Sequence, residues 1–158
     1  MRRLFIGLFL AMSFLSTPVL AQQKSFIRED LASNGIRLEE TLKKAGATVA
    51  AGRQAAQLRQ EGAAALGRDA RRALTLFGAA ISADPNSGAS WLGYARAAMA
   101  VDPGTNYGER YQLRENATTA AYLAYQLANA RAEEALALEW LGRAFARAEA
   151  WRPMLDAY

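Results

Sequence analysis

The sequence predicts an all-α protein built from antiparallel helix hairpins that repeat along the chain. Alanine is abundant and only four prolines occur in 158 residues, a composition that favours helix because alanine has the highest helix propensity and proline breaks helices. Large and small apolar residues also recur at helical spacing, and similar patterns return after 33 positions, from Leu58 to Trp91. That interval is close to the period of about 34 residues found in one class of helical-hairpin repeats.

Residues 1–21 predict a signal for export. Arg2 and Arg3 precede an apolar run over residues 4–15, and Val19-Leu20-Ala21 offers a small-residue cleavage site, the order found in secretory signal peptides. The run is shorter than the about 20 residues that a membrane-spanning helix needs. We expect Sec-type export, cleavage near Ala21 and a periplasmic or secreted chain with no membrane anchor after cleavage.

Charge and composition argue against several classes of function. Without Arg2 and Arg3, the 19 basic residues fall to 17 against 15 acidic ones, which gives no case for nucleic-acid binding. The chain has no cysteine and no histidine, so thiolate nucleophiles, zinc-finger sites and Ser–His catalysis cannot be built. We therefore expect no enzyme activity, no catalytic or metal-ligating residue and no cofactor.

Residues 22–52 predict an N-terminal helix followed by a linker. The helix is expected over about residues 25–45, with an interruption at Asn34-Gly35 and a small-residue linker at 46–52. Its apolar residues fall on one stripe at spacings of four and seven: Ile27, Leu31, Leu38 and Leu42. The helix either packs as a cap on the next unit or docks a partner.

Residues 53–158 predict the repeat domain, and its first hairpin is the most regular. Leu58 and Gly62 belong to the first helix, and Ala73, Phe77 and Ala80 to the second, which Pro85 ends. Gly62, Ala73 and Ala80 are expected to let helix backbones approach closely, and Phe77 to fill the groove between neighbouring hairpins. Trp91 and Tyr94 begin the next hairpin.

The second and third hairpins are less regular. From Trp91 to Leu138 the interval is 47 positions, with the surplus in a stretch of turn-forming residues at 101–108 and helix expected again from about Glu109 to Ala130. The third hairpin is expected to be incomplete, with packing residues Leu141, Gly142, Phe145, Trp151 and Tyr158. The motif of Leu141, Gly142 and Phe145 resembles the tetratricopeptide repeat, which makes about two and a half units.

The surplus loop is the best place for a partner contact. Tyr107, Arg110, Tyr111 and Arg114 lie in or beside it. Long loops within repeats either bind partners or decorate the fold.

Several segments resemble a known family. FIREDLAS (residues 26–33), RLEETLK (37–43), ASWLGYARA (89–97) and WRPMLDAY (151–158) look like the N-terminal helical-repeat region of bacterial, in particular alphaproteobacterial, alpha-2-macroglobulin-family proteins. The resemblance implies the N-terminal part of a periplasmic protease-trapping inhibitor, with endopeptidase inhibition residing in downstream β-sandwich domains and with proteases or envelope proteins as partners. The alternative is a stand-alone periplasmic adaptor that scaffolds a cell-envelope complex.

Overall fold

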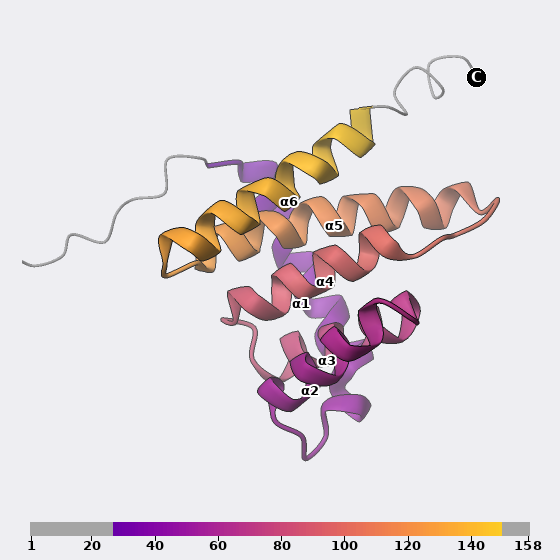
Figure 1. Ribbon diagram of the computed structural model, residues 1–158, viewed down its shortest axis with the longest axis vertical. Helices are drawn as coiled ribbons and strands as arrows, with labels where there is room; N and C mark the ends of the chain where they lie inside the picture. The colour runs from indigo at the N-terminus through magenta and orange to yellow at the C-terminus, as the bar shows by residue number, and fades with distance from the viewer. Residues whose placement is uncertain (1–26, 150–158) are drawn as a thin grey trace, which may run out of the picture.

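The computed structural model describes residues 27–149, and this part of the chain is entirely helix, turn and loop, with no strand. The expected all-α class is confirmed. The helices are α1 (Glu29–Ala50), α2 (Ala55–Leu66), α3 (Ala70–Ala83), α4 (Gly88–Ala100), α5 (Tyr107–Leu127) and α6 (Arg131–Glu149) (Figure 1). Within residues 27–149, none of these helices has the length and apolar character needed to cross a bilayer.

Short polar side chains start three of the helices. Asp69 caps α3 by accepting a hydrogen bond from the backbone N–H of Arg72, at 2.9 Å. Asn106 caps α5 in the same way, with its Oδ1 3.0 Å from the backbone N of Glu109, and Ser87 caps α4. Each cap satisfies a backbone donor that the first turn of a helix leaves without a partner.

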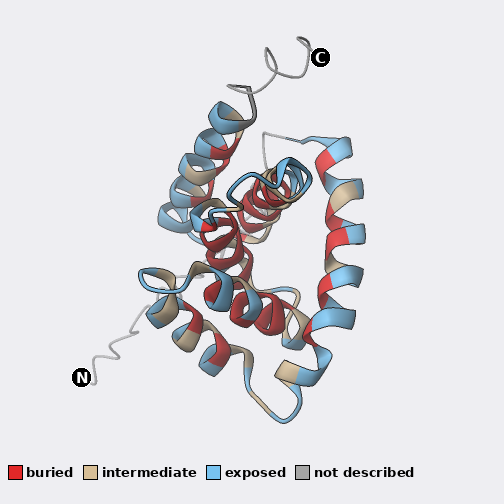
Figure 2. Cartoon of the chain, turned by 90° about the vertical axis from the view of Figure 1, so that its right-hand side faces the viewer, coloured by how far each residue is buried: buried red, intermediate tan, exposed pale blue. Residues whose placement is uncertain are grey.

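The helices pack as antiparallel neighbours with α1 laid across them. α2 packs on α3, α4 packs on α5, and α6 packs on α5 and, less extensively, on α4. α4 also contacts both α2 and α3, which joins the two pairs. α1 runs along one side and contacts α3 and α5 (Figures 1 and 2).

The N-terminal helix differs from the expectation in its continuity and length. α1 is unbroken through Asn34, Gly35 and Gly46, so the predicted interruption and the start of the linker at residue 46 are wrong. Both glycines face other helices: a Cβ on Gly35 would lie 3.1 Å from Leu123, and one on Gly46 would lie 3.0 Å from Cα of Ala79. Close approach to α5 and α3 explains these glycines, and the turn comes only at residues 51–54.

The buried stripe of α1 matches the expected one at three of its four positions. Leu31, Leu38 and Leu42 are buried, and the buried positions of α1 lie on the side of the helix that faces the other helices (Figure 2). Ile27 is 63% exposed and precedes the first residue of the helix. The stripe therefore begins at Leu31, because a residue outside the helix does not share its periodicity.

Phe77 of α3 lies where α2, α3 and α4 meet. A Cβ added to Gly62 of α2 would lie 3.1 Å from Cε2 of Phe77, and one added to Gly93 of α4 would lie 2.1 Å from Cε1. The ring is 4% exposed and packs against the backbone of α2 at Gly62 and of α4 at Gly93. Trp91 is also buried, and its Nε1–H donates to the carbonyl oxygen of Pro85 at 2.7 Å.

The other expected packing positions are distributed as follows. Pro85 and Phe145 are half-buried. Trp151 and Tyr158 lie outside the described residues. The expected packing positions that are buried are Leu58, Gly62, Ala73, Phe77, Ala80, Trp91, Tyr94 and Leu141.

Gly142 packs against no part of the described chain. It is exposed, and a Cβ built on it would meet no described atom within 4 Å. The helical face of α6 that packs carries Ala137, Leu141 and Ala144, and Gly142 lies one residue, about 100° of helix rotation, beyond Leu141. The second helix of the predicted third hairpin falls outside the described residues, so the close approach predicted for Gly142 stays a prediction.

Candidate partner-binding site

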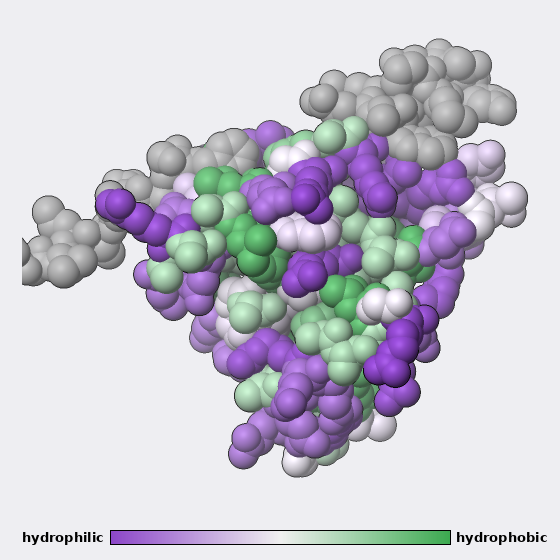
Figure 3. Space-filling model, viewed as in Figure 1, coloured by the Kyte–Doolittle hydropathy of each residue, from purple (hydrophilic) through white to green (hydrophobic). Residues whose placement is uncertain are grey.

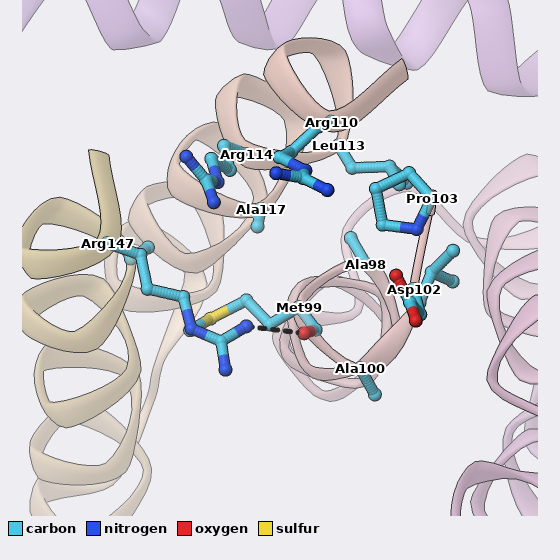
Figure 4. A pocket seen from close by; sticks show the side chains of 12 residues that line it. Ala98, Met99, Ala100, Asp102, Pro103, Arg110, Leu113, Arg114, Ala117 and Arg147 are labelled. Atoms are coloured by element: carbon cyan, nitrogen blue, oxygen red, sulfur yellow. Dashed lines mark hydrogen bonds between the residues drawn. The ribbon is translucent and has the colours of Figure 1, made fainter. Parts of the chain in front are cut away.

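A pocket of about 310 Å³ opens where the end of α4, the loop of residues 101–106, the first half of α5 and the last turns of α6 meet. Its apolar lining comes from three helices and includes Ala98, Leu113, Ala117 and Ala144. Arg110, Arg114 and Arg147 stand around it (Figure 4). The pocket therefore pairs an apolar floor with a basic edge.

Backbone carbonyl groups hold two of the three arginines in place. Arg147 of α6 donates from Nη1 to the carbonyl oxygen of Met99, at 2.7 Å (Figure 4). Arg110 of α5 donates to the carbonyl oxygen of Gly104, and its guanidinium lies 5.5 Å from the centre of the Tyr107 ring. These contacts tie Arg147 to the end of α4 and Arg110 to the α4–α5 loop.

Arg114 is affected by the charges of the other two arginines. Its pKa is lowered mainly by partial burial and, further, by the charges of Arg110 and Arg147. Each of these effects disfavours the charged form of a guanidinium. Arg114 therefore shares the electrostatic environment of both neighbouring arginines.

One carboxylate also lines the described part of the pocket. Asp102 accepts a hydrogen bond from the backbone N–H of Gly104, at 2.9 Å, as a short acidic side chain commonly does in a turn. Its charge also acts on Arg71 of α3, whose pKa is raised mainly by Glu109 and less by Asp102. Three arginines against one aspartate leave the lining basic.

The structure separates the four expected contact residues into two pairs. Arg110 and Arg114 line the pocket. Tyr107 and Tyr111 are 65% and 57% exposed on the same helix and are not part of the lining. The loop itself is shorter than expected, because α5 begins at Tyr107, two residues before the predicted start.

No pattern in the sequence singles out Arg147. It lies 33 positions after Arg114 and reaches the pocket only because α6 packs on α5 and α4. No local motif marks it, since α6 carries other arginines such as Arg131 and Arg143 at exposed positions.

A second group of arginines surrounds Trp140. Trp140 of α6 is half-buried, with the guanidiniums of Arg96 and Arg143 at 5.4 and 4.8 Å from its ring. On the face that Figure 3 shows, apolar residues reach the surface in separate patches between polar ones.

The arginines above the apolar floor can bind a ligand non-covalently. Within residues 27–149, no three carboxylate, histidine or cysteine side chains come together in a way that would hold a metal ion. Comparison of the chain with protein-family models, with curated proteins and with solved structures finds no match. The geometry of the site is thus the basis for a function.

Proposed function

We propose that the chain is a helical protein-interaction module whose binding surface centres on the arginine-lined pocket and the exposed tyrosines beside it. The observation that carries the proposal is the convergence of Arg110, Arg114 and Arg147 on an apolar floor. Tyrosine and arginine are the side chains enriched at the energetic centres of protein interfaces. Tyr107 and Tyr111 add exposed aromatic area on the same helix.

We further propose a tetratricopeptide-like arrangement of the helices. The packing supports it: α2 with α3 and α4 with α5 form successive hairpins, and the first helix of each following unit contacts both helices of the hairpin before it. The position of Phe77 between Gly62 and Gly93 supports it too, since an aromatic residue between small ones is what lets such hairpins stack. α1 covers the second helices, α3 and α5.

For the biological setting, the proposal is the N-terminal module of an exported alpha-2-macroglobulin-like protease inhibitor. The resemblance of residues 26–43 and 89–97 to that family supports it. In this proposal endopeptidase inhibition belongs to downstream domains, and the module contacts proteases or envelope proteins. The second candidate is a stand-alone periplasmic adaptor that scaffolds a cell-envelope complex. The pocket supports both candidates equally.

Sequencing the gene beyond the codon for Tyr158 separates the two settings. Several hundred further codons for β-rich sequence, in any frame, are expected for the inhibitor. A stop codon followed directly by an independent gene with its own ribosome-binding site would support the adaptor instead.

Site-specific photo-crosslinking tests the binding surface itself. A benzoyl-phenylalanine placed at Tyr107 or Tyr111, in the chain expressed in its own bacterium, is expected to link to one defined protein. The same probe at Gln60, an exposed residue of α2, is the matched control. Identical products at all three positions, or none at Tyr107 and Tyr111, would contradict the proposal.

A further inference from the structure

The geometry points to an acidic peptide as the ligand of the pocket: a glutamate or aspartate side chain held among Arg110, Arg114 and Arg147, with a neighbouring apolar side chain on the floor. This inference rests on the proposed function and names the chemistry of the partner. The sequence alone does not predict an acidic ligand, because Arg147 lies beside Arg110 and Arg114 only in the folded chain.

The spacing of the arginines suits a carboxylate. Arg110 and Arg114 are four residues apart on α5, so their Cβ atoms lie about 6 Å apart on one side of the helix. Arg147 approaches from α6 (Figure 4). A guanidinium offers five N–H donors in a planar fork that matches the two oxygens of a carboxylate, so Arg147 has donors beyond the one that it gives to Met99.

The electrostatics favour an anion in the same place. Three arginines and one aspartate line the described part of the pocket, so a carboxylate that enters it meets mainly positive charge. The charges of Arg110 and Arg147 act on Arg114, whose pKa is lowered mainly by partial burial and further by these two charges. Two of the guanidiniums are already oriented by Gly104 and Met99, which reduces the entropy lost when a ligand binds.

The floor and the rim favour a peptide over a polyanion. Ala98, Leu113, Ala117 and Ala144 offer an apolar surface that phosphate or nucleic acid would leave uncovered. The volume of about 310 Å³ is at the small end of ligand pockets, which run from about 300 to 1,000 Å³, and holds one or two side chains. Asp102 at the rim would repel a second adjacent phosphate group.

Fluorescence anisotropy with the purified full chain tests the inference. The probe is a short fluorescein-labelled peptide of alternating glutamate and leucine, amidated at its C-terminus so that its carboxylates are side chains. We expect saturable binding that weakens as salt is raised. Replacing each glutamate of the peptide by glutamine is expected to abolish binding, and replacing each leucine by serine to weaken it.

Variants of the chain locate the binding. Arg110→Gln, Arg114→Gln and Arg147→Gln are each expected to weaken binding about tenfold or more, the effect of losing one charge-assisted hydrogen bond. Arg131→Gln is the matched control, because it removes the same charge from α6 at a position about 24 Å along the helix from Arg147. Arg147→Lys keeps the positive charge but lacks the planar guanidinium, so it should retain part of the affinity. Thermal melts followed by circular dichroism identify any variant that has lost its fold.

Each contrary result has a defined meaning. No binding of the glutamate peptide, equal binding of the glutamine peptide, or wild-type affinity in all three arginine variants would overturn the inference. Inorganic phosphate that displaces the peptide at concentrations near the Kd of the peptide would show a site for simple anions and would overturn it as well. In all these cases the cross-links at Tyr107 and Tyr111 report separately on the proposed function, which fails only if they are absent or unspecific.

Discussion

At the scale of single residues, the most constrained contact is Phe77 between two glycines. Gly62 was expected from the repeat spacing to be a close-approach position, and the ring does lie against it. Gly93 is tighter still, since any Cβ there would overlap the ring at 2.1 Å. Because Phe77 is 4% exposed, it has little room to move.

Gly93→Ala is therefore expected to destabilise the fold although alanine favours helix. Overpacking of a filled core costs about 1–3 kcal/mol, which exceeds the gain of about 0.5–1 kcal/mol from replacing glycine by alanine within a helix. Chemical denaturation followed by circular dichroism measures the difference. The second change Phe77→Leu should make Gly93→Ala less costly, which a double-mutant cycle would show.

Gly142→Ala serves as the control for this experiment. Gly142 also lies within a helix, but no atom of the described residues lies within 4 Å of its added Cβ. The same substitution should therefore stabilise the chain by about 0.5–1 kcal/mol. Equal effects at Gly93 and Gly142 would refute the packing account of Phe77.

At the scale of helices, α1 and α5 are held to the stack by contacts that join distant parts of the chain. Gly46 brings α1 against the backbone of α3 at Gly78 and Ala79. An ion pair between Arg71 Nη1 and Glu109 Oε1, at 2.6 Å, links the start of α3 to the start of α5. This ion pair therefore fixes the first turn of α5, which follows the α4–α5 loop directly, against α3.

The Arg71–Glu109 pair gives the stability of the chain a pH dependence. The hydrogen bond from Arg71 lowers the pKa of Glu109 below its ordinary value of 4.5. A carboxylate with a lowered folded-state pKa stabilises the fold fully above that ordinary value and loses the contribution as the pH falls through the lower one. Glu109→Gln should therefore lower the melting temperature slightly at pH 7 and by less at pH 3.

Glu115→Gln is the matched control for the pH experiment. Glu115 is an exposed residue of the same helix and should show no comparable change between the two pH values. A destabilisation by Glu109→Gln that is constant with pH, or larger at pH 3, would mean that the ion pair does not contribute.

At the scale of the whole molecule, the sequence predicts export through residues 1–21. Residues 1–26 lie outside the described part of the structure, so the signal peptide stays a prediction from sequence. Mass spectrometry of the protein recovered outside the cytoplasm is expected to find a chain that starts at Gln22. Ala21→Phe should leave the precursor uncleaved, because signal peptidases need a small residue there.

Gln23→Phe controls for the bulk of the new side chain. It places the same residue two positions beyond the expected cleavage point, where processing should continue. Normal cleavage despite Ala21→Phe, or a mature chain that starts at another residue, would contradict the predicted cleavage after Ala21.

The sequence by itself determined the helical class, and most of the packing positions predicted from it are buried. Leu58, Phe77 and Trp91 are buried where helical periodicity placed them, because local spacing determines the apolar stripe of a helix. The caps at Asp69 and Asn106 were not predicted, although each involves only residues close in the sequence.

Only the tertiary structure decided which helix faces meet. The turn-forming residue types of Asn34-Gly35 predicted a break, yet the helix continues there because Gly35 faces Leu123 of α5. Nor does any sequence pattern mark Arg147, which the packing of α6 brings to the pocket beside Arg110 and Arg114. Periodicity shows that a helix has an apolar face. Contacts between residues far apart in the chain decide which helix packs against that face and which sites form between helices.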